Sequence, residues 1–222
     1  MKFESLSFTE ENYLKAIFHL SENGEKEVFT NDISDYLQTK PASVTDMYRK
    51  LAQKSLINYV KYQGVTITDL GKNTALQIIR KHRLWEVFLV EKLKFSWDEV
   101  HEVAEQLEHI QSPLLTKRLD EFLGFPQYDP HGDPIPNELG IMKIYQKKSL
   151  SEAEIGEKGA VVGVQDTSPI FLKYLDKIGV GLSSFIELID RVEYDGSVEI
   201  MVDKTQQAVI SLQVAKNIFI SC

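Results

Sequence analysis

The residues best suited to chemistry lie between positions 101 and 109, in the segment HEVAEQLEH. On a helix, with about 100° between successive residues, His101, Glu105, Glu108 and His109 share one face, and apolar side chains occupy the opposite arc. Mn²⁺, Fe²⁺ and Zn²⁺ accept carboxylate oxygen together with neutral imidazole, and ligands one turn apart are partly ordered before the ion arrives. The segment predicts a metal site. The alternative is a solvated acidic face with two incidental histidines.

The composition limits the kind of protein and the kind of ligand. Apolar residues make up 43% and charged residues 26% of the 222 residues, as in an ordinary soluble globular protein. No apolar run approaches the roughly 18 residues of a membrane span, and the N-terminal segment lacks the features of a signal peptide, so we expect a cytoplasmic protein without a membrane partner. The single cysteine, Cys222, excludes a disulfide framework and a cysteine-rich zinc site. Any metal ligands must then be His, Asp, Glu or Asn.

Charge is distributed unevenly along the chain. The net charge of −8 argues mildly against a nucleic-acid partner for the chain as a whole. Residues 39–72, however, contain six basic and two acidic residues, a net charge of +4. Because salt screens charges over about 10 Å, the local patch decides whether phosphates are attracted. This segment is therefore a candidate nucleic-acid surface.

The elements that surround this basic segment predict a winged helix. Apolar periodicity predicts helices over residues 9–22, 31–37 and 41–54. The first would start with a capping box of Thr9 and Asn12, and the third with Pro41 at its first position. Alternation and β-branching predict a hairpin with strands over residues 57–62 and 65–68.

Helical periodicity continues through the middle of the chain, and short strands fill the last third. The helical segments are residues 69–93, 97–111 and 113–123, followed by a Pro- and Gly-rich loop over residues 125–137. The later strands are residues 157–164, 184–189, 197–202, 208–212 and 217–220, with a short helix at 171–176. Short strands at regular spacing indicate a small β-barrel. We expect a mainly α fold with small β, in domains of residues 1–72, 73–148 and 149–222.

The third helix of a winged helix enters the major groove of DNA. Ala42 could touch a thymine methyl group, and Ser43 and Thr45 could donate to phosphates or bases. The residues expected at DNA are Lys40, Pro41, Ala42, Ser43, Thr45, Arg49 and Lys50 on this helix and Lys61 and Tyr62 on the wing. With no arginine or glutamine near the start of the helix, specificity would rest on methyl contacts and DNA shape. A role in solubility alone is the other interpretation of Lys50.

Five motifs resemble, in order and spacing, the diphtheria toxin repressor family of metal-dependent transcriptional regulators. They are SVTDM at 43–47, YVKYQGVTITDLG at 59–71, RKHRLWE at 80–86, EQLEH at 105–109 and DPHGDPIP at 129–136. Each is moderately specific by itself, but together they cover nearly the whole chain. The sequence is similar to the longer members, which end in an SH3-like, FeoA-like domain.

The resemblance implies a transcriptional repressor rather than an enzyme. Its fold would be an N-terminal winged helix-turn-helix, a helical dimerisation and metal-binding domain, and a C-terminal SH3-like β-barrel. The expected protein is a homodimer, joined through helices of residues 75–123, that binds palindromic operator DNA when metallated and represses metal-uptake genes. Mn²⁺ or Fe²⁺ is the expected cofactor, with Zn²⁺ or other divalent ions possible in vitro.

The primary metal site implied by the resemblance consists of Glu105, Glu108 and His109 with Asn12 from the first helix. The iron-sensing branch of the family is expected to carry a thiol at the position of Glu105, and the manganese-sensing branch a carboxylate. Asn12 departs from the family, which usually has Asp or Met there. Its amide oxygen can ligate but brings no charge, so either the affinity is lower or Glu11 takes its place.

A second metal site is implied by the pair His82 and Glu86, spaced i, i+4, with His101. The loop motif DPH adds Asp129 and His131, with an acidic ligand where streptococcal-type manganese sensors carry a thiol. Asp166 is the candidate ligand from the C-terminal barrel, with Gln165 as the fallback.

Two other functions stay open at this point. A winged-helix regulator that senses an organic ligand in an apolar pocket would make the two-histidine face incidental. A metalloenzyme has less support, because the sequence contains neither an HExxH motif nor the paired Glu-x-x-His repeats of a di-iron bundle.

Overall fold

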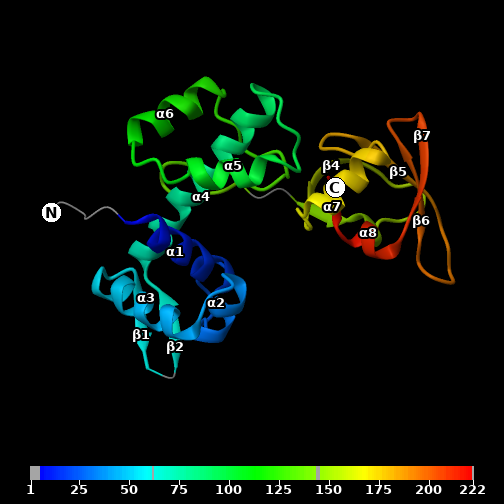
Figure 1. The fold of residues 1–222 in the computed structure, drawn as a ribbon. Coiled ribbons are helices and arrows are strands. Elements are labelled where there is room, and N and C mark those ends of the chain that lie inside the picture. The colour runs from blue at the N-terminus through cyan, green and yellow to red at the C-terminus, as the bar shows by residue number, and fades with distance from the viewer. Residues whose placement is uncertain (1–5, 62, 144–145, 222) are drawn as a thin grey trace. The chain divides into compact units, whose positions relative to one another are not determined.

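The computed structural model describes residues 6–61, 63–143 and 146–221 (Figure 1). Tyr62, predicted to contact DNA, lies outside the described residues. The chain forms two compact units. The first comprises Met1–His82, Glu105–Arg118 and Pro136–Ile141, and the second comprises Arg83–Ala104, Leu119–Ile135 and Met142–Cys222.

Three helices and a two-stranded hairpin form the N-terminal part of the first unit. They are α1 (Phe8–Leu20), α2 (Thr30–Tyr36), α3 (Pro41–Gln53), β1 (Ile57–Val60) and β2 (Gly64–Ile67). Leu14, Ile33, Val44 and Leu51 are fully buried and join the three helices in one core. The strands are antiparallel, with Ile57 opposite Ile67. The predicted winged helix is confirmed.

Helix α1 begins one residue earlier than predicted, and its cap is a different residue. Oγ of Ser7 accepts the backbone N–H of Glu10 at 3.3 Å, and the Glu10 carboxylate accepts the N–H of Ser7 at 2.8 Å. The predicted capping box of Thr9 and Asn12 is therefore wrong. Ser7 and Glu10 have the same spacing, and Glu10 supplies the carboxylate that completes a capping box.

Helices α4 (Asp69–Glu91), α5 (Val100–Leu107) and α6 (Pro113–Phe122) confirm the helical middle of the chain, with ends shorter than predicted. Each contains residues of both units. In the second unit, Leu84 and Val87 of α4 pack with Leu119 of α6 and Ile135 of the following loop. Within the described ranges, no helix combines the length and apolarity that a bilayer crossing would need.

The C-terminal part of the second unit is an antiparallel sheet of six strands in the order β3-β8-β4-β5-β6-β7. Its elements are β3 (Lys147–Ser149), η1 (Leu150–Glu152), β4 (Lys158–Val164), α7 (Pro169–Lys177), β5 (Phe185–Arg191), β6 (Val198–Val202), β7 (Gln206–Ile210), α8 (Leu212–Lys216) and β8 (Ile218–Ser221). Alternate residues such as Ile186, Leu188, Val198 and Ile200 form its core. Strand β3 and helix α8 were not predicted. The fold class, mainly α with a small β domain at the C-terminal end, is confirmed.

Candidate metal centre

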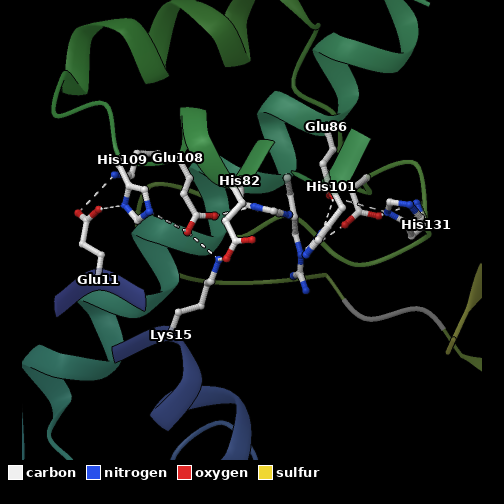
Figure 2. A network of polar contacts seen from close by, with 12 residues as sticks. Glu11, Lys15, His82, Glu86, His101, Glu108, His109 and His131 are labelled. Carbon is white, nitrogen blue, oxygen red and sulfur yellow. Dashed lines mark hydrogen bonds and ion pairs between the residues drawn. The ribbon is translucent and has the colours of Figure 1, made fainter. Parts of the chain in front are cut away.

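Glu108, the residue that follows helix α5, is a fully buried carboxylate in the first unit. Its Oε2 lies 2.6 Å from Nδ1 of His82 on α4, and its Oε1 lies 2.6 Å from Nζ of Lys15 on α1 (Figure 2). Burial alone would raise the pKa of Glu108, but the hydrogen bond with His82 and the charge of Lys15 outweigh it and lower the pKa. Glu108 is therefore held as a carboxylate, the form that ligates a metal.

His109 is buried, and Glu11 fixes the orientation of its ring. Nδ1 of His109 lies 2.5 Å from Oε2 of Glu11, and the ring of Phe8 stacks on the imidazole with centroids 4.6 Å apart. A carboxylate accepts its hydrogen bond from an N–H, so Nδ1 carries the proton and Nε2 holds the lone pair. Nε2 lies 3.9 Å from Oε1 of Glu108. The ring thus presents Nε2 to Glu108. Its hydrogen bond to Glu11 is of the kind that orients a metal-binding histidine, which donates its other N–H to a carboxylate.

Glu11 is surrounded by groups that fix its carboxylate. Its Oε1 accepts a hydrogen bond from Nε2 of Gln111 at 2.5 Å, and Nζ of Lys81 lies 3.7 Å away. Burial lowers the pKa of Lys81, although the charges of Glu11 and Glu108 oppose this shift. Both oxygens of Glu11 thus make a hydrogen bond, and one of these bonds orients His109.

The predicted primary ligand set also includes Asn12 and Glu105. Oδ1 of Asn12 is buried and has no hydrogen-bond partner among the described residues, a costly state that a cation would relieve. The Glu105 side chain is 44% exposed, and its Oε1 lies 3.6 Å from Nζ of Lys15. Two carboxylates, an imidazole and an amide oxygen fit a divalent cation of the Mn²⁺ or Fe²⁺ type.

Sequence reasoning missed Lys15. The only local signal was its i, i+4 spacing from Glu11 on α1, which is common on helix surfaces. Its partner Glu108 is 93 residues away. A contact between two such distant segments cannot be read from helical periodicity.

A second group of ligand atoms lies in the second unit. Glu86, Asp129 and His131 are buried and offer ligand atoms within 4.8 Å of one another. Nδ1 of His131 lies 3.7 Å, and Nδ1 of the more exposed His101 lies 3.3 Å, from Oε1 of Glu86. His82, also predicted as a ligand of this site, lies one turn before Glu86 on α4, and its Nδ1 contacts Glu108 of the first unit. The structure therefore gathers four of the second-site residues in this unit.

Asp129 and His131 of this second group have pKa values shifted from their ordinary values. Burial and the charge of Glu86 raise the pKa of Asp129 to about 7. Burial opposes protonation of His131, but the hydrogen bond and charge of Glu86 prevail and raise its pKa to about 9. Without a metal, Asp129 and His131 therefore bind protons near pH 7. The negative charge of Glu86, which raises both pKa values, also attracts a cation.

The loop that carries Asp129 and His131 is held against strand β4. The carbonyl oxygen of His131 accepts the N–H of Val164 at 3.0 Å. Gly132 has φ +83°, and a Cβ there would lie 1.9 Å from the carbonyl oxygen of Val162. Only glycine allows this approach, so the C-terminal sheet sets the position of the ligand loop.

Asp166 is not a member of this three-residue group. Its Oδ1 accepts the N–H of Ser168 at 2.8 Å, just before helix α7. The fallback, Gln165, donates its backbone N–H to the carbonyl oxygen of Asn217 at 2.9 Å. A ligand role for Asp166 stays a prediction.

Most of the predicted DNA-contacting residues are exposed in the first unit. Lys40, Pro41, Ala42, Ser43, Arg49 and Lys50 are exposed on α3 or at its N-cap, and Lys61 is exposed beside the wing. Thr45 is half-buried, and its hydroxyl donates to the carbonyl oxygen of Pro41 at 3.1 Å. Arg49 pairs with Asp46 at 2.9 Å. The start of α3 is thus open to a nucleic acid.

Three family models match the chain in succession. The model for the iron dependent repressor N-terminal DNA binding domain matches residues 5–65. The model for the iron dependent repressor metal binding and dimerisation domain matches residues 68–137, and the FeoA domain matches residues 148–222.

Individual proteins show the same similarity. A solved structure of a manganese-dependent transcriptional repressor in complex with manganese is 34% identical, covers 96% of this chain and 99% of its own, and has a TM-score of 0.80. The iron-dependent repressor IdeR of Mycobacterium tuberculosis is 32% identical over 60% of this chain, and the matched part spans only 58% of IdeR. The diphtheria toxin repressor of Corynebacterium glutamicum is 25% identical over 90% of this chain and 94% of its own length.

Proposed function

Because the chain belongs to the iron-dependent repressor family, we propose that it is a homodimeric, metal-dependent transcriptional repressor that binds palindromic operator DNA and represses metal-uptake genes. The family consists of transcriptional repressors, not enzymes. As a regulator of operator DNA, the protein would act in the cytoplasm. The matches at residues 5–65, 68–137 and 148–222 support the proposed domains at 1–72, 73–148 and 149–222.

The observation that carries this proposal is the pairing of His109 with Glu11 and Glu108. Glu11 holds the proton of His109 on Nδ1, so that Nε2 is presented toward the Glu108 carboxylate. When bound, a divalent cation would supply positive charge to Glu105, Glu108, His109 and Oδ1 of Asn12, which has no hydrogen-bond partner in the described part of the chain. Each of these residues offers the donor atom that such an ion prefers.

The ligands come from two segments of the first unit. Asn12 lies on α1, which packs on the recognition helix α3, and the other ligands lie at the end of α5 or just after it. Engagement of both segments would hold α1, and α3 with it, in one position. In a dimer this sets the spacing of two recognition helices against half-sites about one turn of DNA, or a multiple, apart.

A dimer surface is supported by apolar side chains on α6. Leu114 and Phe122 are about two-thirds exposed, and Leu115 is also exposed. Large exposed apolar residues on one helix are typical of surfaces that another protein covers. We therefore propose that α6 belongs to the interface between two copies of the chain.

Mn²⁺ or Fe²⁺ is the proposed metal. Carboxylate, amide and imidazole groups suit both ions, and no thiol lies among the proposed ligands. The similarity to a manganese-dependent repressor that contains manganese favours Mn²⁺. Since Mn²⁺ binds weakest in the divalent series, metal availability and geometry must contribute to selectivity.

Fluorescence anisotropy of an operator, selected from random DNA in the presence of Mn²⁺, tests the function. The chelated full-length chain should bind weakly, and Mn²⁺ or anaerobic Fe²⁺ should tighten binding about 5- to 150-fold, the usual range of allosteric coupling. Glu108→Gln should abolish this stimulation, whereas Glu22→Gln, at an exposed residue, should retain it.

Retention of full stimulation by Glu108→Gln would overturn the assignment of the site. If chelation and metal addition leave the affinity of the wild-type chain unchanged, the regulator senses another kind of ligand. The organic-ligand alternative would then replace metal sensing.

A further inference from the structure

Lys15 contacts two of the proposed ligands of the primary site. Its Nζ lies 2.6 Å from Oε1 of Glu108 and 3.6 Å from Oε1 of Glu105, which are two of the proposed ligands. The side chain is 23% exposed, whereas that of Glu108 is fully buried. The ammonium group thus supplies the charge that a buried carboxylate requires.

The same oxygen of Glu108 serves both possible cations. Oε1 accepts the Lys15 hydrogen bond, and it also lies 3.9 Å from Nε2 of His109. A metal held jointly by Glu108 and His109 would use the carboxylate oxygen that faces Nε2 of His109. An ammonium group on the same oxygen would then meet a like charge at close range, so the two cations exclude each other.

We propose that Lys15 is a built-in competitor of the metal, which holds Glu105 and Glu108 in the metal-free protein and lowers the metal affinity of the primary site. This inference rests on the proposed metal-dependent function and deepens it. The charge balance agrees with it. Glu105 and Glu108 bring two negative charges, Asn12 brings none, and Lys15 cancels one of the two.

Lys15 also connects α1 to the segment after α5, the two segments that a bound metal would connect. Its bond to Glu108 joins α1 to the segment after α5 without an ion. The bond between His109 and Glu11 joins the same two segments. The metal-free protein is therefore already held together at this point, and metal binding exchanges one cation for another.

The test measures Mn²⁺ binding to the full-length, chelator-treated chain by electron paramagnetic resonance of free Mn²⁺. Lys15→Gln and Lys15→Met should lower the dissociation constant of the primary site about 10-fold, as expected for removal of one charge a few ångströms from the ion. Lys26→Gln is the matched control, because Lys26 forms an exposed ion pair with Glu22 in the same unit. It should change the constant less than twofold.

A double variant assigns the effect to this site and not to the group around Glu86. In the Glu108→Gln background, Lys15→Gln should no longer tighten Mn²⁺ binding, because its partner is gone. Equal tightening in both backgrounds would overturn the proposal.

A second readout uses the wild-type chain and needs no variant to fold. Acetylation of Lys15, followed by mass spectrometry, should be slow in the metal-free protein and several-fold faster with Mn²⁺, while Lys26 reacts equally in both states. Unchanged Lys15 reactivity together with an unchanged dissociation constant in Lys15→Gln would refute competition but leave metal sensing intact. If neither the wild-type chain nor Lys15→Gln binds Mn²⁺, the proposed function itself fails.

Discussion

Oε2 of Glu11 lies 2.5 Å from Nδ1 of His109, although the two residues are 98 positions apart in the chain. This bond joins helix α1 of the winged helix to the residue beside Glu108. It also fixes the tautomer of His109, because the carboxylate requires a proton on Nδ1. In the proposed metal site, Glu11 therefore acts through His109, as a positioning residue.

Replacement of Glu11 should weaken metal binding without removing a ligand. Loss of a carboxylate that orients a metal-binding histidine typically lowers metal affinity 10- to 100-fold. We expect Glu11→Ala to raise the Mn²⁺ dissociation constant about 10-fold, measured by calorimetry on the full-length chain. Glu25→Ala, at an exposed position of the same unit, should have no effect. Equal affinities for wild type and Glu11→Ala would show that His109 needs no such partner.

Lys40 should contribute phosphate contacts and not base recognition. It is exposed at the N-cap of α3, beside the residues predicted to enter the major groove. Lys40→Ala should weaken metal-stimulated DNA binding similarly for all sequences. It should reduce the slope of log affinity against log salt by about 1.8, because each copy in the proposed dimer loses one phosphate contact of about 0.9. Lys158→Ala, on strand β4 of the C-terminal sheet, is the control and should leave the slope unchanged. A loss of affinity that depends on operator sequence would instead assign Lys40 to base recognition.

Asp98 should make the stability of the second unit depend on pH. Its Oδ2 lies 3.3 Å from Nζ of Lys173 on α7. A hydrogen bond with Ser96 and the charge of Lys173 lower the pKa of Asp98 below its ordinary value. The carboxylate therefore stabilises the fold above its unfolded-state pKa of about 3.9, and this contribution is lost as the pH falls through the lower folded-state pKa.

The variant Asp98→Asn should lose this contribution. In urea unfolding of the metal-free chain, followed by tryptophan fluorescence, it should be about 0.5 kcal/mol less stable than wild type at pH 6, with the difference shrinking as the pH falls through the lowered folded-state pKa. Asp176→Asn, at an exposed position on α7, should match wild type at every pH. A stability difference that grows toward low pH would contradict the assignment.

The elements could be predicted where side-chain periodicity is strong. Helix α3 begins at Pro41 as predicted, and its apolar positions, such as Val44 and Leu51, are fully buried. Strand β3 was missed because Lys147, Lys148 and Ser149 have no apolar alternation, and its strand geometry comes from pairing with β8. Helix α8 is only five residues long, too short for a periodic signal.

The candidate site could be predicted only to the extent that its residues are neighbours in sequence. Spacing within one helix grouped Glu105, Glu108 and His109. It could not show that Lys15 reaches Glu108, or that Glu11 reaches His109, because these contacts depend on how α1 packs in the folded unit. Sequence spacing therefore groups candidate ligands that are neighbours in the chain, but it does not reveal contacts from distant segments such as those of Glu11 and Lys15.

Gly132 should allow the C-terminal sheet to position the loop that carries Asp129 and His131 of the second metal group. At φ +83° its backbone lies so close to β4 that a Cβ would overlap the carbonyl oxygen of Val162. Gly132→Ala should therefore push away the loop that carries Asp129 and His131 and destabilise the chain by about 2 kcal/mol or more, as expected for backbone strain combined with a steric clash. Binding of Mn²⁺ at the second group should weaken, while binding at Glu108 and His109 persists.

The matched control for this substitution is Gly181→Ala, because nothing lies within 4 Å of a Cβ at that glycine and its φ is not positive. Thermal unfolding measures the stability of both variants, and a Mn²⁺ titration in the Glu108→Gln background isolates the second group. If Gly132→Ala is as stable as Gly181→Ala and binds Mn²⁺ equally well there, the sheet does not position the loop. A selective loss in Gly132→Ala would make the C-terminal domain part of metal binding, because the residues that hold the ligands in place would then belong to β4.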